Sequence, residues 1–487
     1  MGWSASAFSS FSSCLFSACL VSLLLLCFST SNKAYFAYAN GGEETHFHTL
    51  QVTSLLPPTG RHACKFSPNG RHEEGESLTV FHSHGPCSPH KANSPILTEI
   101  LSQDQSRVNS IQSRVAFRSG QSYVLRNSQA NLPANSGLSL GTLNYVVRVS
   151  LGTPKKDLSL IFDTGSDLTW TQCRPCVRSC YTQKDPIFNP SMSRTYRNIT
   201  CNSSKCSQLV SATGVNPGCS SSTCIYGIQY GDQSFSIGFF GTDTLTLTST
   251  DTFPNFFFGC GQNNRGLFGS VAGLLGLGRD PLSLVSQTAS KFKKYFSYCL
   301  PSSSSSTGHL TFGKKGSIGA LKFTPFSANP RAASFYFIDV TGIRVGRQRL
   351  PIELSVFQEA GMVIDSGTVI TRLPPTAYAA MRASFRKQME SYPLTSAQSI
   401  LDTCYDLSQY SSVSIPRISF FFAVGVEVPL TESGILFGTS LSQVCLAFAA
   451  NSNDSDVGIF GNLQQRTLEV AYDIAAGKLG FGTAGCS

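Results

Sequence analysis

One short acidic pattern occurs twice in this chain, each time inside an apolar frame. Ile161-Phe162-Asp163-Thr164-Gly165-Ser166 recurs as Val363-Ile364-Asp365-Ser366-Gly367-Thr368. Each copy is followed downstream by two apolar residues and a glycine, at Leu274-Leu275-Gly276 and at Ile459-Phe460-Gly461. A pattern that recurs in this way indicates a duplicated structural unit. The duplication predicts that the two aspartates lie on facing loops.

Two carboxylates that face each other closely can hydrolyse a peptide bond without a metal or a covalent intermediate. Like charges a few ångström apart raise one pKa and leave the other low, so the pair shares a proton and supplies both an acid and a base. The hydroxyl residue after each aspartate can brace the two loops, and the next glycine permits a tight turn whose N–H reaches the carboxylate. A single Asp-Thr-Gly is also an ordinary turn. Two framed copies favour Asp163 and Asp365 as a catalytic pair.

A third pattern, Ile225-Tyr226-Gly227-Ile228-Gln229-Tyr230-Gly231-Asp232-Gln233-Ser234, is typical of a β-hairpin with a polar, Gly-containing tip. Taken alone, it indicates a surface hairpin with a packing tyrosine. Beside a catalytic pair, the same hairpin can close over a cleft, exclude water and hold substrate, with Tyr230 supplying a ring and a hydroxyl. We therefore interpret it as a flap.

From Tyr145 onward the chain predicts an all-β architecture, because short strand-like runs alternate with Gly-rich turns. Charged residues make up only 13% of the chain, while Gly and Phe are plentiful. One helix is expected after Pro374-Pro375, where Tyr378, Met381 and Phe385 form an apolar stripe suited to core packing. The runs expected to be strands include 158–162, 244–247, 335–340 and 469–472.

The N-terminus is typical of a secretory signal. The first charged side chain is Lys33, and the strongly apolar run from Cys14 to Phe28 is too short for a comfortable membrane span. Ala37-Tyr38-Ala39 provides a cleavage site, so residues 1–39 are interpreted as a signal peptide; a cut nearer Ser31 and an uncleaved anchor are the alternatives. We expect no membrane association once the signal is removed.

Residues 40–140 are interpreted as a pro-segment that ends between Arg118 and Asn144. The segment holds seven of the eight histidines and one helical pattern around 101–115, and no strand is expected before residue 144. Its histidines would become charged as the pH falls through about 6–7, which would loosen contacts made by their neutral forms. This hypothesis concerns His46, His48, His82 and His84; ordinary solvated histidines are the alternative.

Composition excludes several other enzyme and binding classes. The formal charge of +9 is modest for this length, and the basic residues are scattered rather than gathered in the stripe expected of a nucleic-acid binder. Outside the pro-segment only His309 remains, in a segment expected to be a polar Ser/Gly-rich loop, so a Ser-His or Cys-His nucleophilic enzyme has no plausible base. The chain has no H-e-x-x-H pattern for a zinc protease. We expect no metal and no cofactor.

These patterns together resemble the pepsin-like aspartic proteases, and more narrowly their plant nepenthesin-type branch. The resemblance runs from Asn144-Tyr145 to Leu479-Gly480-Phe481-Gly482. It implies a bilobal fold with two pseudo-symmetric β lobes, 141–330 and 331–487, a catalytic cleft between them, a flap, and a cysteine-rich insertion from Cys173 to Cys224. It gives catalytic roles to Asp163 and Asp365. The remaining implied binding-site residues are Tyr230, Trp170 (its hydrogen-bond partner), Gly165, Gly367, Ser166 and Thr368.

The resemblance also implies a disulfide pattern for the twelve cysteines from Cys173 onward, which spacing alone cannot assign. The implied pairs are Cys173–Cys176, Cys180–Cys260, Cys201–Cys224, Cys206–Cys219, Cys299–Cys486 and Cys404–Cys445. A zinc site built from Cys173, Cys176 and Cys180 is the alternative. Three sequons, at Asn198, Asn202 and Asn453, predict glycosylation if the chain enters the secretory pathway.

The resulting functional hypothesis is a secreted aspartic endopeptidase that hydrolyses peptide bonds at acidic pH through a water activated by the Asp pair. It is expected in the apoplast or a vacuole, with the chloroplast as a minor alternative. It would be a monomer that acts on polypeptides and is inhibited by its own pro-segment. A catalytically silent inhibitor or binding protein of the xylanase-inhibitor type is the main alternative. A third hypothesis comes from His84-Gly85-Pro86-Cys87-Ser88 and Asp104-Gln105-Ser106-Arg107-Val108, which resemble a subgroup that includes a chloroplast-nucleoid DNA-binding protease. No nucleic acid is expected here, because no basic patch is evident.

Overall fold

The computed structural model describes most of the chain from His46 onward. The described residues are 46–56, 64–65, 77–83, 85–89, 97–118, 145–230, 234–266, 268–303, 305–313, 320–327, 332–359, 361–483 and 485–486. The expected signal peptide, its cleavage site and His84 lie outside them. Within these ranges, no helix combines the length and the apolar character needed to cross a membrane.

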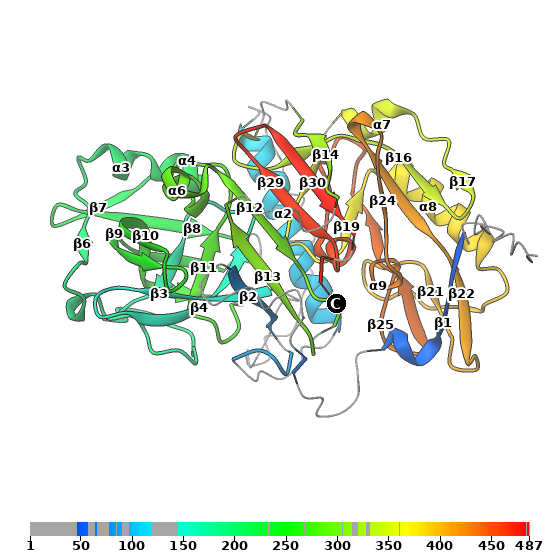
Figure 1. Ribbon diagram of the computed structural model, residues 1–487, viewed down its shortest axis with the longest axis horizontal. Coiled ribbons are helices and arrows are strands. Elements are labelled where there is room, and N and C mark those ends of the chain that lie inside the picture. The colour runs from blue at the N-terminus through cyan, green and yellow to red at the C-terminus, as the bar shows by residue number, and fades with distance from the viewer. Residues whose placement is uncertain are drawn as a thin grey trace, which may run out of the picture. The chain divides into compact units, whose positions relative to one another are not determined.

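The described chain is mainly β, as the alternation of strand-like runs and turns predicts. Its largest sheet combines strands of the N-terminal half with strands close to the C-terminus (Figure 1). In sheet order its strands are β14 (Lys322–Pro325), β30 (Lys478–Gly482), β29 (Glu469–Asp473), β12 (Tyr295–Cys299), β13 (Thr307–Phe312), β2 (Ser77–His82), β3 (Tyr145–Leu151), β4 (Lys156–Asp163), β11 (Gly273–Gly276), β5 (Trp170–Gln172), β10 (Thr252–Arg265), β9 (Phe235–Thr246), β8 (Thr223–Gln229) and β7 (Gly218–Ser220), with β6 (Arg197–Asn198) beside β9.

Four smaller sheets lie in the C-terminal half or attach to it. The first contains β15 (Phe337–Ile338), β18 (Met362–Ile364), β28 (Gly458–Phe460), β19 (Thr371–Leu373) and β27 (Phe448–Ala450). The second contains β17 (Gln348–Arg349), β16 (Val340–Val345), β23 (Ile418–Phe422) and β24 (Val426–Pro429). The third contains β20 (Leu394–Thr395), β21 (Cys404–Tyr405), β26 (Gln443–Leu446) and β25 (Leu436–Ser440), and the fourth pairs β1 (Phe47–Gln51) with β22 (Ser412–Pro416).

Two longer helices, both expected from the sequence, accompany the sheets. The helix α8 (Pro375–Gln388) begins after Pro374 and buries Tyr378, Met381 and Phe385, as its apolar stripe predicts. The other is α2 (Leu97–Arg118), which confirms the helical pattern of the presumed pro-segment. The shorter helices are α3 (Ser204–Ser207), α4 (Leu209–Thr213), α5 (Leu284–Gln287), α6 (Ala289–Phe292), α7 (Leu354–Gln358), α9 (Glu432–Ile435) and the 3-10 turns η1 (Val52–Leu55), η3 (Pro190–Met192), η5 (Ala423–Gly425) and η6 (Asn462–Gln465).

The internal repeat folds into two equivalent strand arrangements. In the N-terminal half, β4 pairs in parallel with β11, β11 pairs antiparallel with β5, and β5 pairs in parallel with β10. In the C-terminal half, β18, β28, β19 and β27 pair in the same order and with the same directions. Each downstream apolar-apolar-Gly run therefore forms the strand beside its aspartate, with Leu275 opposite Phe162 and Phe460 opposite Ile364.

The prediction that no strand precedes residue 144 is wrong. β2 is inserted between β13 and β3 in the large sheet, and β1 pairs with β22 of the C-terminal half. β2 alternates half-buried and buried residues, and Leu78 and Val80 belong to the main hydrophobic core. This six-residue run has the period of a strand, but its apolar residues are too few to form a core without the sheet around them.

Two predicted disulfides near the first strand repeat, Cys173–Cys176 and Cys180–Cys260, are also wrong. Cys299–Cys486 and Cys404–Cys445 occur as expected. The structure contains Cys173–Cys260 and Cys176–Cys180. Because β5 and β10 run in parallel, Cys173 lies beside the segment that carries Cys260, and its N–H donates to the Gly261 carbonyl at 2.7 Å. All three cysteines of the alternative zinc site are therefore in disulfides.

Two more predicted pairs, Cys201–Cys224 and Cys206–Cys219 of the cysteine-rich insertion, are wrong. The structure contains Cys201–Cys219 and Cys206–Cys224. Cys219 and Cys224 are opposite each other in the β7–β8 hairpin. Cys224 is buried and meets the buried Cys206 of α3, whereas Cys219 is exposed and meets the half-buried Cys201. Burial thus separates the two pairs in a way that spacing does not reveal.

A seventh disulfide, Cys64–Cys87, joins two parts of the presumed pro-segment and was not assigned from the sequence. Its neighbour Lys65 forms a β-bridge with Ser306, which follows β12. The Cys87 Sγ atom also lies 3.3 Å from the Ser305 carbonyl oxygen. The disulfide therefore holds this part of the segment against the N-terminal half.

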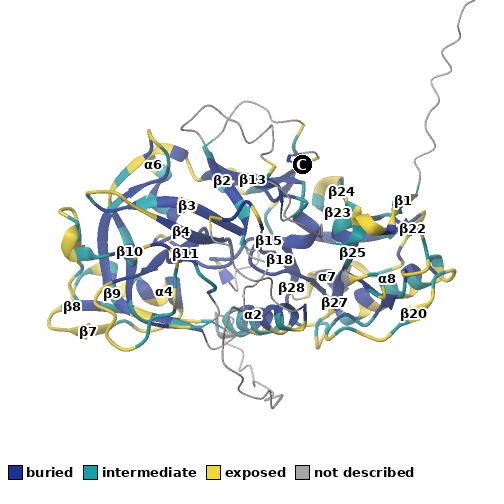
Figure 2. Ribbon diagram, turned by 90° about the horizontal axis from the view of Figure 1, so that it is seen from below, coloured by how far each residue is buried: buried dark blue, intermediate teal, exposed yellow. Residues whose placement is uncertain are grey.

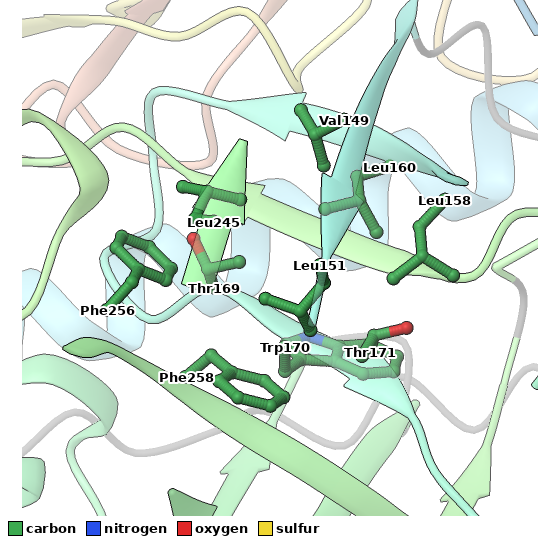
Figure 3. Close-up of a pocket in the computed structure, with 10 residues that line it drawn as sticks. All are labelled: Val149, Leu151, Leu158, Leu160, Thr169, Trp170, Thr171, Leu245, Phe256 and Phe258. Carbon is green, nitrogen blue, oxygen red and sulfur yellow. The ribbon is translucent and has the colours of Figure 1, made fainter. Parts of the chain in front are cut away.

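An apolar pocket lies inside the N-terminal half, between β3, β4, β5, β9 and β10 (Figure 3). Its volume is about 10 Å³, which is about the space that one water molecule needs. Its lining is Val149, Leu151, Leu158, Leu160, Thr169, Trp170, Thr171, Leu245, Phe256 and Phe258. The pocket is a gap in core packing and does not have the polar groups of a ligand site.

Candidate active site

The two predicted loops meet and brace each other through the residues that follow the aspartates. The Ser366 N–H donates to the Thr164 hydroxyl at 2.9 Å, and the Thr164 N–H donates to the Ser366 hydroxyl at 3.1 Å. All of these atoms are buried. The reciprocal pair satisfies two backbone donors at the junction of the two strand repeats. It fixes the spacing of Asp163 and Asp365.

Each aspartate is also oriented by its own turn. The Gly165 N–H donates to Asp163 Oδ1 at 3.0 Å, and the Gly367 N–H donates to Asp365 Oδ1 at 3.2 Å. These are the bonds that the Asp-x-Gly turns predict. The outer hydroxyls differ, because Thr368 donates to Asp365 Oδ2 at 2.6 Å whereas the buried Ser166 hydroxyl has no hydrogen-bond partner among the described residues.

A cation from the presumed pro-segment lies on the aspartate pair. Arg107 of α2 donates from Nη2 to Asp163 Oδ1 at 2.6 Å and to Asp365 Oδ1 at 2.8 Å, and from Nε to Asp365 Oδ2 at 2.8 Å. One nitrogen thus bonds both carboxylates, so the two acids converge on a single point. A side chain on Gly367 would collide with this guanidinium, since a Cβ there would lie 2.3 Å from Arg107 Cζ.

The guanidinium changes the electrostatics of the pair. Burial alone would raise the pKa of Asp365, but the charge of Arg107 and its hydrogen bond, with those of Thr368 and Gly367, outweigh burial and hold the pKa below its ordinary value of 3.8. The two carboxylates are 1% and 0% exposed, and Arg107 is 22% exposed. In this state both acids are covered, and the Arg107 guanidinium occupies the space between them.

The sequence predicts inhibition by the pro-segment but does not identify Arg107 as the residue that covers the pair. The available signal is the spacing of Arg107 and Arg114, which are seven residues apart and therefore on one face of a helix. Arg114 donates to the Gly165 carbonyl at 2.8 Å and lies over the Phe335 ring. Both arginines of this face thus contact the junction of the two halves.

The apolar face of α2 packs on the C-terminal half. Val108, Ile111 and Val115 share a buried cluster with residues of β15, β18 and β28, and Leu97, Ile100 and Leu101 share another with residues after Asp365. Figure 2 shows the helix lying between the elements of the two halves with its buried side turned toward them. The stripe that predicts the helix is therefore its docking surface.

Two polar side chains of α2 make contacts that resemble those of a bound polypeptide. The Gln112 amide donates to the Val457 carbonyl at 2.7 Å and accepts from the Val457 N–H at 2.8 Å, the pairing that one strand offers another. Asp104 accepts from the Val369 and Ile370 N–H groups and forms an ion pair with Arg372 at 2.9 Å. These contacts lie on the side of the aspartate pair formed by the C-terminal half.

The expected flap residues also meet. β8 and β9 form an antiparallel hairpin, and Trp170 Nε1 donates to the Tyr230 hydroxyl at 2.8 Å, the hydrogen bond that the resemblance implies. Burial raises the pKa of Tyr230, so its hydroxyl keeps its proton. Gly231, Asp232 and Gln233 at the tip lie outside the described residues.

The surroundings of His309 differ from the prediction. It lies in β13 rather than in a polar loop, is buried, and its Nε2 is 2.8 Å from Glu469 Oε2. It belongs to the large sheet and contacts neither aspartate in any described interaction.

The three sequon residues, Asn198, Asn202 and Asn453, are exposed.

Comparison with known proteins places these features in a family. The family model described as "Xylanase inhibitor N-terminal" matches residues 145–314, and "Xylanase inhibitor C-terminal" matches residues 335–483. An aspartyl protease family protein of Arabidopsis thaliana is 56% identical over 91% of this chain and 94% of its own length. The aspartic proteinase nepenthesin-2 of Nepenthes gracilis is 39% identical over 72% of this chain and 80% of its own.

Solved structures with the same fold include the basic 7S globulin from soybean. The two structures align with a TM-score of 0.56 at 20% identity, over 71% of this chain and 94% of the globulin. The structure of edgp aligns with a TM-score of 0.57 at 23% identity, over 70% of this chain and 92% of edgp. At these identities the likeness concerns the fold. With the sequence matches, it shows that the chain belongs to the plant pepsin-like aspartic protease family and is a homologue of the nepenthesins.

Proposed function

We propose that this chain is the self-inhibited precursor of an aspartic endopeptidase that cuts polypeptides at acidic pH. One observation carries the proposal: Asp163 and Asp365, from equivalent loops of the two halves, bond the same guanidinium nitrogen. Acids brought that close share a proton when the cation leaves. The relatives named as aspartyl proteases, at 56% and 48% identity, support the same reaction class.

The proposed mechanism uses one water molecule between the two carboxylates. The ionised acid takes a proton from the water as it attacks the peptide carbonyl, and the protonated acid donates its proton to the carbonyl oxygen, which gives a gem-diol. The acid that took the water proton then donates it to the departing nitrogen as the C–N bond breaks, and the other acid takes a proton back from a gem-diol hydroxyl. The N–H groups of Gly165 and Gly367 orient Oδ1 of each acid, and these two oxygens converge on the point where the water would lie. Tyr230, held by Trp170, would cover the substrate as a flap.

The proposed inhibitor is the segment of residues 40–140, through α2. Arg107 fills the position that the attacking water needs, and the helix covers the face beside Asp365. Because all of these contacts come from one chain, inhibition needs no partner. Cleavage of the chain between Arg118 and Asn144, followed by release of α2, would expose the acid pair.

A silent inhibitor or binding protein of the xylanase-inhibitor type remains the second candidate, because both family models bear that description. The presence of both aspartates, both turn glycines and the Trp170–Tyr230 pair favours the protease. The proposed route is secretion, to the apoplast or a vacuole, with a monomeric mature enzyme. The disulfides and exposed sequons are compatible with that route.

The test is digestion of an unfolded protein across about pH 3–7 by the processed wild type and by Asp163→Asn. The wild type should cut at acidic pH and be blocked by pepstatin. The variant should lose at least about a hundredfold in rate, because it lacks one of the two acids.

Asp157→Asn is a matched control, since Asp157 is an exposed acid on the same strand β4. It should retain full activity. Equal cleavage by Asp163→Asn and the wild type would contradict the proposal, and binding without cleavage by the processed wild type would favour the inhibitor.

A further inference from the structure

A carboxylate-binding site lies beside the acid pair, and in this structure Asp104 of α2 occupies it. Asp104 Oδ1 accepts from the Val369 N–H at 2.5 Å, and Oδ2 accepts from the Ile370 N–H at 3.2 Å. Arg372 Nη2 lies 2.9 Å from the same Oδ2. Three donors, one of them charged, therefore converge on a single carboxylate, which is the arrangement of a specific acid-recognition site.

All three donors belong to the mature part of the chain and follow Asp365 closely. Val369 and Ile370 lie between the Asp365 turn and β19, and Arg372 is the middle residue of β19. The carboxylate they bind comes from the segment that must leave. The site therefore survives maturation, but its occupant does not.

Without Asp104, Arg372 has few hydrogen-bond partners. It is fully buried, its Nη1 donates to the Ile370 carbonyl at 2.8 Å, and its Nε has no hydrogen-bond partner in the described part of the chain. Burial lowers the pKa of Arg372 and raises that of Asp104, so both groups are desolvated by the contact. When α2 leaves, the Arg372 guanidinium loses this carboxylate and its donors are available to another carboxylate.

The site lies within reach of a substrate that spans the acid pair. Asp104 and Arg107 are three residues apart on one helix, so their Cα atoms differ by about 4.5 Å along its axis. An extended chain covers that length in one to two residues. A side chain bound at Arg372 would thus lie about two residues from the bond being cut.

We propose that Arg372, with the Val369 and Ile370 N–H groups, is a specificity site of the mature enzyme that selects substrates carrying Asp or Glu at one fixed position near the scissile bond. The inference rests on the proposed function, because only a processed protease has a substrate to select. In the precursor, Asp104 acts as the substrate's acidic side chain.

The experiment begins with the processed wild-type enzyme and a mixture of peptides from a digested proteome. Sequencing the products should show enrichment of Asp and Glu at one position within about two residues of the cut. Synthetic peptides that differ only by Glu or Gln there should then differ at least about tenfold in kcat/KM, because a buried donor site rejects an analogue that leaves it unpaired.

Arg372→Gln should abolish that ratio by slowing cleavage of the Glu peptide, and Arg372→Lys should retain part of it. Arg382→Gln is the matched control, since Arg382 of α8 is partly exposed and pairs with Asp402 rather than with Asp104, and it should leave the ratio unchanged. If Arg372→Gln fails to fold because Asp104 is left without its cation, the double variant Arg372→Gln/Asp104→Asn, which removes both charges, is used in place of the single variant.

The outcomes separate the two proposals. A wild-type enzyme that cuts proteins with no acidic preference, or an Arg372→Gln enzyme that keeps the preference, would overturn the specificity site and leave the protease assignment intact. A processed wild type that cuts nothing would overturn both.

Discussion

Thr368 and Ser166 occupy equivalent places after the two Asp-x-Gly turns, yet only one of their hydroxyls bonds an aspartate. Thr368 donates to Asp365, and this bond helps to lower the pKa of Asp365. Ser166 has no such bond among the described residues. The duplicated loops are therefore alike in backbone and unlike in the hydrogen bonds to their acids, and the bond from Thr368 favours the ionised form of Asp365.

Thr368→Val should move the acidic limb of the pH profile of kcat/KM to higher pH in the processed enzyme. The bond that favours the ionised form of Asp365 is lost, so its pKa rises and a higher pH is needed to ionise it. Ser166→Ala is the matched control and should shift the limb less. A larger shift for Ser166→Ala would contradict the asymmetry of the two loops.

Arg107→Met should make the precursor active without processing. The substitution leaves two buried carboxylates without their cation, which weakens docking of α2 by about 3–5 kcal/mol, the usual cost of breaking a buried ion pair. The measurement is cleavage of a reporter peptide by the unprocessed chain. Arg148→Met removes an exposed arginine paired with Asp157 and should leave the precursor silent. A silent Arg107→Met precursor would show that Arg107 is not the inhibitory group.

At the scale of the element, the presumed pro-segment is integrated into the fold rather than laid over it. β2 is an interior strand of the largest sheet, α2 buries an apolar face, and β1 extends the C-terminal half. Release of the segment thus opens a sheet between β13 and β3 as well as the acid pair. The segment needs few apolar residues of its own, because they pack into the hydrophobic clusters of the later part of the chain.

The Cys64–Cys87 disulfide should keep β2 in place. The two cysteines are 23 residues apart, so in the loop-closure description the bond stabilises the folded state by about 3 kcal/mol. Replacing both with serine should let the precursor process itself at a higher pH than the wild type, which a pH series on a denaturing gel measures. Replacing Cys404 and Cys445 together is the comparison, since that disulfide lies within the C-terminal half. An unchanged processing pH in the Cys64/Cys87 variant would contradict this role.

At the scale of the whole molecule, the proposed pro-segment is attached to both halves, and its attachments respond differently to acid. The pKa of Asp365 is lowered in the docked state, so the Arg107 contact contributes above the ordinary Asp range and is lost as the pH falls through it. Burial lowers the pKa of His48 in β1, so protonation also favours release, beginning nearer pH 6.5. Asp104 opposes them, since burial raises its pKa and acid favours its docked form.

His48→Gln tests this attachment. Burial lowers the pKa of His48, nearby Arg417 adds to the effect, and Glu432 and the Leu430 carbonyl oppose it. Because a glutamine cannot become charged, release of the segment should require a lower pH than in the wild type. The pH midpoint of self-processing measures the shift. His46→Gln is the neighbouring control, and equal midpoints for His48→Gln and the wild type would remove His48 from the activation step.

The sequence by itself determined the acid pair, its bracing hydroxyls, the flap tyrosine with its tryptophan, and the helices α2 and α8. The acid pair, its hydroxyls and the two helices are encoded in short stretches of chain, as a repeated turn or an apolar period, so local chemistry is enough to predict them. The pairing of Tyr230 with Trp170 was implied by the family resemblance. Only the tertiary structure decided that Arg107 covers the pair, that Asp104 meets Arg372, that β2 enters the sheet, and how the clustered cysteines pair. These contacts join residues distant in sequence, and their geometry depends on how the sheets close, which no local pattern encodes.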